Sequence, residues 1–191
     1  TVGTDVSVGK MFTSLAIERD MKARGMKADF RATGQTGIFI AGEGASVDAV
    51  VADFIAGAAE WLTPANDPDH WDVVEGQGSL FHASYSGVTL GLIHGSRPHA
   101  LVLCHDAARR EMRGTPGVPV PALEDCIAVN ERMARMFEPD AKVVGVSVNT
   151  SSMDDARATA YLAEIADRLS LPAVDAVRTG VGPIVDAIEK L

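Results

Sequence analysis

The sequence contains no long apolar run and only two cysteines. Because no run of about 18 apolar residues occurs, it predicts no membrane-spanning helix and no membrane partner. Cys104 and Cys126 lack the spacing of a metal site, and a chain so poor in cysteine is most simply placed in the cytoplasm. We therefore expect a cytoplasmic protein without a cysteine-bound metal.

Positive charge is also scarce. The chain has 17 Lys and Arg against 26 Asp and Glu, which gives a formal net charge of −9. An acidic surface repels a phosphate backbone, so we expect no nucleic-acid partner. With 191 residues, 47% of them hydrophobic, the chain can bury one sizeable core. The composition therefore favours a single globular domain over residues 1–191 that acts on a small molecule.

The most informative stretch lies at the start of the chain, where a strand end, a glycine-bracketed turn and a helix start follow one another. Such a turn points several backbone N–H groups at one place, beside the positive end of a helix dipole, and a lysine adds a mobile cation. This arrangement predicts a P-loop that binds phosphate. Its candidate phosphate-binding residues are Gly3, Thr4, Asp5, Val6, Ser7, Val8, Gly9 and Lys10.

The loop departs from the common P-loop in two ways. One more residue separates Gly3 from Gly9 than the common pattern has, and Met11 stands where a Ser or Thr hydroxyl would bind Mg²⁺. A thioether is a poor ligand for this hard cation. The next hydroxyl, that of Thr13, is expected on another side of the helix. The loop therefore suits phosphate groups better than it suits Mg-ATP.

Apolar runs alternate with amphipathic segments along the rest of the chain, a pattern typical of a parallel, doubly wound α/β sheet. Residues 34–44, with four glycines, are expected to form a long flexible loop, and Ser46 is expected to cap the helix that follows. The expected strands are 28–33, 71–74, 100–104, 142–148 and 172–177, and the expected helices are 10–24, 46–61, 81–94, 121–136, 153–169 and a last one after 182. Since the chain opens on the end of a strand, we expect an earlier first strand within a longer protein.

Candidate site residues follow the predicted strands, because open α/β sheets bind ligands at the carboxyl ends of their strands. Glu75 comes directly after a strand and could act as a base or hold Mg²⁺. His105 follows the next strand at the same edge, and His82 is a third candidate for the base. The residues expected to contact the substrate are Arg31, Gln35, Thr36, Gly76, Gln77 and Arg97. Asp48 and Asp53 either reach this edge or are surface acids.

Several motifs together resemble a bacterial P-loop family, long described as a domain of unknown function, that includes D-glutamate N-acetyltransferase. The motifs are Gly-Thr-Asp-x-x-Val-Gly-Lys-Met at 3–11, Ala-Thr-Gly-Gln-Thr-Gly at 32–37, Asp-Phe-Ile-Ala-Gly-Ala-Ala-Glu at 53–60, Glu-Gly-Gln-Gly-Ser-Leu at 75–80, His-Gly-Ser-Arg-Pro at 94–98 and Asn-Thr at 149–150. A more distant likeness is to dethiobiotin synthetase. The resemblance implies a three-layer α/β/α P-loop NTPase-like fold, an additional N-terminal Rossmann-like domain, and contact of Asn149 with a nucleotide base.

The resemblance leaves more than one function open. The first is N-acetyl transfer from acetyl-CoA to the amine of a D-amino acid, with D-glutamate as the expected acceptor, and it needs a base but no metal. The alternative is an ATP- and Mg²⁺-dependent ligase or kinase of the dethiobiotin synthetase type, in which Glu75 helps to hold the metal and Thr4, Asp5 or Thr13 supplies the missing oxygen. A nucleotide-sensing P-loop protein is the third. The helices rich in Ala and Gly also favour a homo-oligomer.

Overall fold

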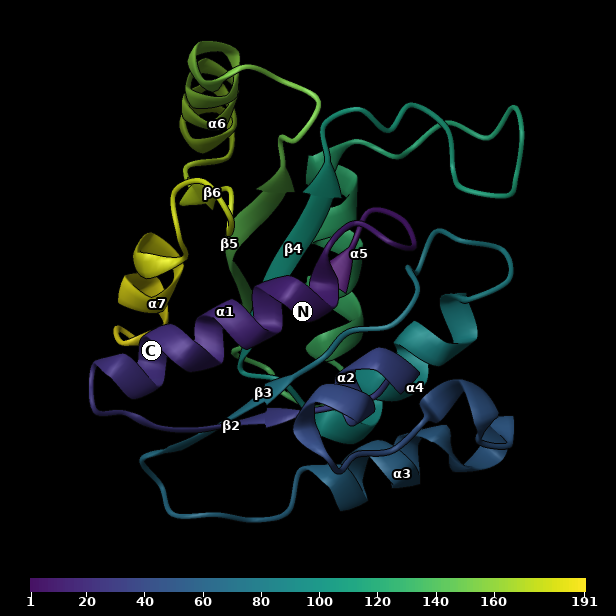
Figure 1. The fold of residues 1–191 in the computed structure, drawn as a ribbon. Coiled ribbons are helices and arrows are strands. Elements are labelled where there is room, and N and C mark those ends of the chain that lie inside the picture. The colour runs from purple at the N-terminus through teal and green to yellow at the C-terminus, as the bar shows by residue number, and fades with distance from the viewer.

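The computed structural model describes residues 1–191 as three layers, with a parallel sheet between two layers of helices (Figure 1). The strands are β1 (Val2–Gly3), β2 (Lys27–Arg31), β3 (His70–Val74), β4 (Ala100–Asp106), β5 (Lys142–Asn149) and β6 (Ala173–Val174). The helices are α1 (Lys10–Ala23), α2 (Gln35–Ala41), α3 (Ile55–Leu62), α4 (Ser86–Ser96), α5 (Leu123–Ala134), α6 (Asp155–Leu169) and α7 (Gly182–Ile188). The expected α/β class with a parallel sheet is confirmed.

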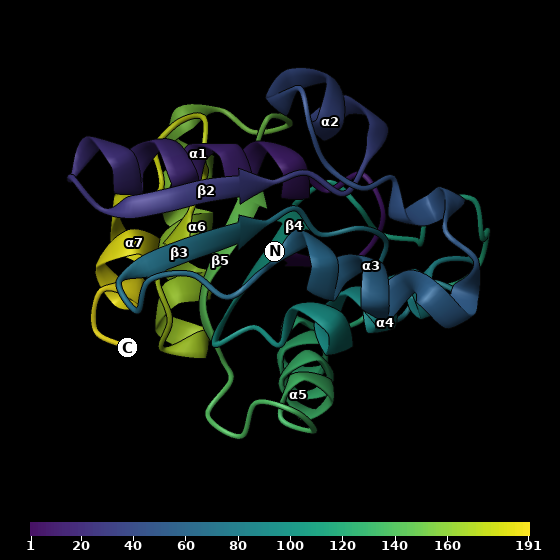
Figure 2. The same ribbon diagram turned by 90° about the horizontal axis from the view of Figure 1, so that it is seen from below.

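All strand pairs are parallel, in the orders β1-β4-β5-β6 and β2-β3. Figure 2 shows β2 and β3 side by side and pointing the same way. The two groups meet at Thr1, whose backbone nitrogen donates a hydrogen bond to the Val74 carbonyl at 3.0 Å. The Thr1 hydroxyl in turn accepts the Gly76 N–H at 2.9 Å. The end of β3 is thereby held next to the start of the P-loop.

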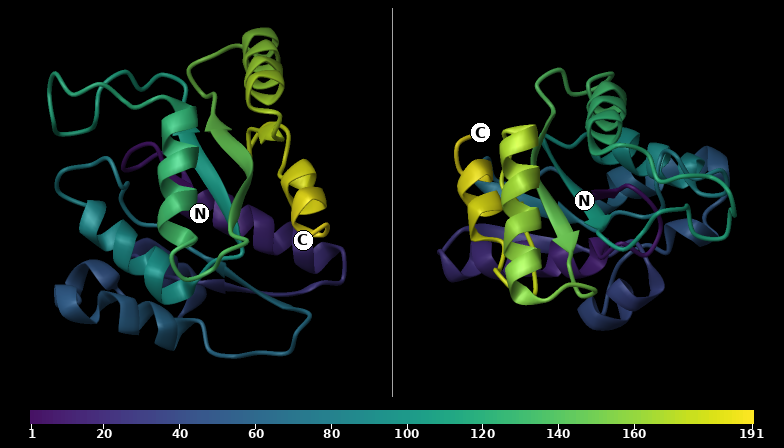
Figure 3. Two further views of the ribbon diagram at one scale, coloured as in Figure 1. Left: turned by 180° about the vertical axis from the view of Figure 1, so that it is seen from behind. Right: turned by 90° about the horizontal axis from the view of Figure 1, so that it is seen from above.

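Two cores lie on the two faces of the sheet. Helices α1 and α7 bury Ile17, Met21 and Ile184 against one face. Helices α4, α5 and α6 cover the other face, and Figure 3 shows α5 in front of β4 when the molecule is seen from behind. Strand β5 is buried from Val143 to Val148, as expected of a parallel strand with helices on both sides.

Two expected elements were wrong. Residues 35–41 form helix α2 rather than a flexible loop; the Glu75 carboxylate accepts the Gly34 N–H at the start of this helix, and Gly42 ends it at φ +80°. The helix expected from Ser46 is interrupted by two short 3₁₀ turns, Val47–Ala49 and Ala52–Phe54, before α3 begins. Ser46 donates to Asp48 instead of capping a helix. None of the helices combines the length and the apolar composition that a membrane span requires.

Close contact between α3 and α4 yields a first prediction. A Cβ on Gly95 would overlap the Ala56 carbonyl oxygen, whereas a Cβ on Gly87 of the same helix would meet nothing within 4 Å. Gly95→Ala should therefore lower the free energy of unfolding by roughly 1–3 kcal/mol, and Gly87→Ala should raise it by up to about 1 kcal/mol. Urea unfolding of both variants tests this, and equal stabilities would contradict the helix contact.

Candidate phosphate-binding site

The loop between β1 and α1 turns through two residues with left-handed backbone, Ser7 at φ +53° and Gly9 at φ +98°. The Lys10 side chain folds back under this turn, and its Nζ donates to the Asp5 carbonyl at 2.9 Å. A Cβ on Gly3 would lie 2.8 Å from that Nζ, so glycine is needed where the lysine passes. The loop therefore has the shape of a P-loop closed around its own lysine.

Two cavities open over the loop and share part of their walls. We name the first, of about 510 Å³, the Met11 cavity; it is lined by Ser7, Val8, Gly9, Lys10, Met11, Phe12, Gly34, Gln35, Thr36, Asp48, Glu75, Gly76 and Gln77. We name the second, of about 520 Å³, the Arg113 cavity; it is lined by Val6, Ser7, Lys10, Asp48, Gln77, Gly78, Tyr85, Val88, Arg113 and Gly114. The predicted residues Gln35, Thr36, Gly76 and Gln77 thus lie together with the turn of the P-loop.

Lys10 is the buried cation of this site. Burial lowers its pKa to about 8, although the nearby carboxyl groups of Asp5 and Glu75 act in the opposite direction. A lysine in this state is charged only in part near pH 8. A phosphate placed beside Nζ would favour the charged form of Lys10. Binding of an anion at this site and protonation of Lys10 therefore stabilise each other.

Asp5 fastens the P-loop to the loop that follows β4. Its fully buried carboxylate accepts the Val6 N–H at 2.7 Å, an Arg109 guanidinium N–H at 2.6 Å and the Arg113 N–H at 2.8 Å. Gly3, Thr4 and Asp5 line neither cavity, whereas Val6 to Lys10 do. The part of the predicted loop that can reach a ligand is therefore its second half, and Asp5 supports it from below.

Glu75 lies at the wall of the Met11 cavity but is only 3% exposed. Its Oε2 accepts the backbone N–H groups of Thr33 and Gly34 at 2.9 and 3.0 Å. A Cβ on Gly37 would overlap this same oxygen, so α2 can approach Glu75 only because that residue is glycine. One oxygen of Glu75 thus holds α2 in place, and Oε1 makes no hydrogen bond within the chain.

The two predicted histidines do not line either cavity. His105 is buried, with its Nδ1 3.1 Å from the Thr4 hydroxyl, and burial lowers its pKa to about 4, so its ring is neutral at pH 7. His82 is also buried and is held at both nitrogens, by the Arg113 carbonyl at 2.8 Å and by the Ser84 N–H at 3.2 Å. The structure thus places His105 under the P-loop and His82 under the Arg113 loop, and it does not bring either to Glu75.

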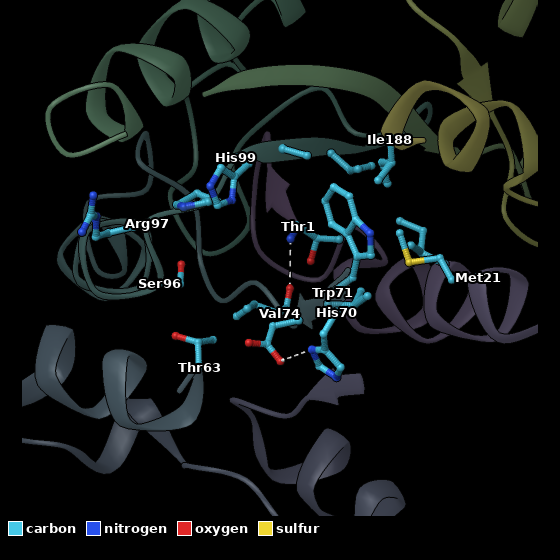
Figure 4. Close-up of a pocket in the computed structure, with 16 residues that line it drawn as sticks. Thr1, Met21, Thr63, His70, Trp71, Val74, Ser96, Arg97, His99 and Ile188 are labelled. Carbon is cyan, nitrogen blue, oxygen red and sulfur yellow. Dashed lines mark hydrogen bonds and ion pairs between the residues drawn. The ribbon is translucent and has the colours of Figure 1, made fainter. Parts of the chain in front are cut away.

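The expected position of Arg97 was wrong. It ends α4, on the way back to the start of β4, and so lies at the opposite edge of the sheet from the P-loop. There it borders a separate cavity of about 270 Å³ between β3 and β4, shown in Figure 4 with Thr1 and Trp71. Its guanidinium donates to the Phe137 carbonyl at 3.0 Å. Arg31 also lies outside the two P-loop cavities, and its Nε donates to Asp72 at 2.7 Å.

Asn149 ends β5 at the same edge as the P-loop, and its side chain accepts the Ser151 N–H at 3.0 Å. Beside it, buried Asp175 accepts hydrogen bonds from the backbone N–H and the hydroxyl of Thr150. Burial alone would raise the pKa of Asp175, but these bonds and those from Val177 and Arg178 outweigh it and lower the pKa below 3.8. Asn149 is therefore exposed on a well-anchored turn.

Thr4, Asp5 and Thr13 are the residues that could supply an Mg²⁺ ligand in place of Met11. Their side-chain oxygen atoms make contacts within the chain instead. The Thr13 hydroxyl is buried 2.8 Å from the Ser147 hydroxyl, and the Thr4 hydroxyl lies 3.1 Å from His105. The Asp5 carboxylate makes the internal contacts described above, and none of these three residues lines the Met11 or the Arg113 cavity. Thr4, Asp5 and Thr13 therefore do not replace the hydroxyl that Met11 lacks.

A parallel α/β sheet with a glycine-bracketed loop, a buried lysine at the start of the next helix and cavities over that loop defines a P-loop domain. Residues 1–185 match the family described as "Domain of unknown function (DUF1611_C) P-loop domain", and the chain belongs to that family. The predicted family and fold are thereby confirmed.

Two curated relatives carry the name D-glutamate N-acetyltransferase. The relative from Tritonibacter scottomollicae is 57% identical over 187 residues, and that from Pseudoalteromonas sp. is 50% identical over 185 residues. These matches cover 98% and 97% of this chain but only 56% of each relative, so the chain spans little more than half their length. A crystal structure of a DUF1611 family protein from Anabaena variabilis superposes with a TM-score of 0.93 at 39% identity and covers 100% of this chain and 56% of that one.

Proposed function

We propose that this chain is the phosphate-binding part of an N-acetyltransferase that moves an acetyl group from acetyl-CoA to the amine of D-glutamate. The names of the two relatives support the reaction. The observation that carries it is the P-loop itself, which combines a buried Lys10 with Met11 in place of a metal-binding hydroxyl. Coenzyme A presents a diphosphate that such a loop can bind without a metal.

The residues that would hold the donor are the second half of the loop. The backbone N–H groups from Ser7 to Lys10 and the Lys10 ammonium would bind the phosphates, since the Val6 N–H is already bound to Asp5, and acetyl-CoA supplies a thioester carbonyl as the electrophile. Among the three predicted bases only Glu75 lines either of the two P-loop cavities, and its Oε1 is the oxygen left for an incoming ammonium proton. Backbone N–H groups near Gly76 would serve the tetrahedral intermediate.

We further propose that the chain is the C-terminal part of a longer protein, because its relatives are nearly twice as long. The other part would complete the substrate pocket. Cytoplasmic location and homo-oligomeric assembly stay predictions.

Binding and turnover of the intact protein test the proposal. Calorimetry should detect acetyl-CoA and CoA without added metal, and thiol release should follow on addition of D-glutamate but not L-glutamate. Tight binding of ATP that requires Mg²⁺, with no binding of CoA, would favour the ligase or kinase instead. Binding of ATP without turnover of any amine or acid would favour a nucleotide sensor.

The Lys10 pKa predicts how CoA binding depends on pH. Because the charged amine binds phosphate and its pKa is about 8 in the ligand-free protein, affinity should be highest below pH 8 and should weaken above it. Above that pKa the affinity for CoA should fall by up to about tenfold per pH unit, because Lys10 must take up one proton when the phosphate binds. Calorimetric titrations between pH 6.5 and about 9.5 measure this, and an affinity independent of pH would contradict the role of Lys10.

A further inference from the structure

The Met11 and Arg113 cavities meet at four residues: Ser7, Lys10, Asp48 and Gln77. Three of them offer hydrogen-bond donors, and Asp48 is the one anion. Transfer between two bound substrates requires that their reacting atoms touch, so they must meet where the two cavities join. The junction is therefore where an attacking amine would lie, with a carboxylate beside it.

Asp48 is available for such an amine. Its Oδ1 accepts a hydrogen bond from Ser46 at 2.7 Å, its side chain forms no salt bridge, and it is exposed. The short 3₁₀ turn at Val47–Ala49 is held by buried Val47, which places the acid above the P-loop. A carboxylate in this position can bind an ammonium group through a charge-assisted hydrogen bond.

Arg113 supplies the opposite charge, farther from the junction. It lines only the Arg113 cavity, and its guanidinium makes no hydrogen bond or salt bridge within the chain. Its backbone is nevertheless fixed at both polar groups, since its N–H donates to Asp5 and its carbonyl accepts from His82. A planar guanidinium on a fixed backbone is suited to bind a carboxylate in a forked geometry.

We propose that the Arg113 cavity is the acceptor site, in which Asp48 binds the ammonium and Arg113 binds a carboxylate of the D-amino dicarboxylic acid. This inference rests on the proposed acetyl transfer and adds the location and the recognition residues of the acceptor. The donor then occupies the Met11 cavity, where Met11 and Phe12 offer apolar surface. The two buried histidines hold the walls of the site, since His82 binds the Arg113 carbonyl and His105 contacts Thr4 of the P-loop.

Two variants of the intact protein test the acceptor site, each with a matched control. Arg113→Ala and Asp48→Asn should each raise the KM for D-glutamate by roughly 10- to 100-fold, the loss expected for one charge-assisted contact. The Kd for acetyl-CoA, measured by calorimetry, should stay within about twofold of wild type, since neither change removes a proposed phosphate contact. Arg110→Ala and Asp53→Asn change exposed residues of the same charge that line neither cavity, and should keep the wild-type KM.

The outcomes separate this inference from the proposed function. A wild-type protein that acetylates D-glutamate, with both variants at the wild-type KM, would place the acceptor elsewhere and overturn the inference alone. An equal loss of acetyl-CoA affinity in both variants would also overturn it, because the effect would then be on the donor. A wild-type protein that releases no thiol with any D-amino acid would overturn the proposed function and the acceptor site together.

Discussion

Replacing Lys10 by alanine is expected to weaken acetyl-CoA binding by roughly 10- to 100-fold, the effect of losing one charge-assisted contact to a phosphate. The reason is that Nζ of Lys10 is the buried cation of the P-loop. It donates to the Asp5 carbonyl in the ligand-free protein and can donate to a phosphate oxygen instead. Calorimetry and the KM for acetyl-CoA measure the loss. The KM for D-glutamate should change much less.

Lys22→Ala provides the matched control for Lys10. Lys22 lies on the same helix, but it is half-exposed and pairs with Glu18 on the surface. Surface pairs of this kind contribute little, about 0–1 kcal/mol, so both substrates should bind as in wild type. If Lys10→Ala bound acetyl-CoA as tightly as Lys22→Ala, the phosphates would not lie in the P-loop.

Replacing Asp5 by alanine is expected to lower the free energy of unfolding by about 3–5 kcal/mol, as is typical when one partner of a buried ion pair is removed. The change leaves the Arg109 guanidinium and the N–H groups of Val6 and Arg113 without their acceptor. It also releases the Arg113 loop from the P-loop, so substrate binding should weaken as well. Urea unfolding at neutral pH measures the stability.

Asp186→Ala is a suitable comparison for Asp5. Asp186 pairs with Arg24 on the surface, where its side chain is 56% exposed, and the change should cost less than about 1 kcal/mol. The loss of unfolding free energy for Asp5→Asn should lie between those for Asp5→Ala and Asp186→Ala, because the amide oxygen can still accept one of the N–H groups. A loss for Asp5→Ala no larger than that for Asp186→Ala would show that Asp5 does not hold the two loops together.

Features set by neighbouring residues in the sequence could be predicted. Buried runs such as Val143 to Val148 predict parallel strands, and the glycines around Lys10 predict the loop, because each depends on local pattern and backbone freedom. Helix α2 could not be predicted in this way. Its first turn depends on Glu75, which is 41 residues from Gly34, and four glycines in a short stretch predict a loop.

The candidate site residues also divide into those that the local sequence predicts and those that contacts between distant residues position. Glu75 was expected at the P-loop edge because it follows a strand. The prediction for Arg97 is wrong, because a residue between a helix and the next strand lies at the edge opposite the carboxyl ends of the strands, which are the ends where open α/β sheets bind ligands. Arg113 gave no signal, because it lies in an irregular loop whose position is fixed by Asp5, more than a hundred residues away. For Asp48 the sequence predicts only that it either reaches this edge or faces solvent, as it does for Asp53.

The most direct test of the central claim is a crystal structure of the intact protein with coenzyme A. The account predicts the diphosphate within hydrogen-bond distance of the backbone N–H groups from Ser7 to Lys10, with Nζ of Lys10 turned from the Asp5 carbonyl toward a phosphate oxygen and no metal between them. Density for coenzyme A away from this loop, with Lys10 still bound to Asp5, would contradict it.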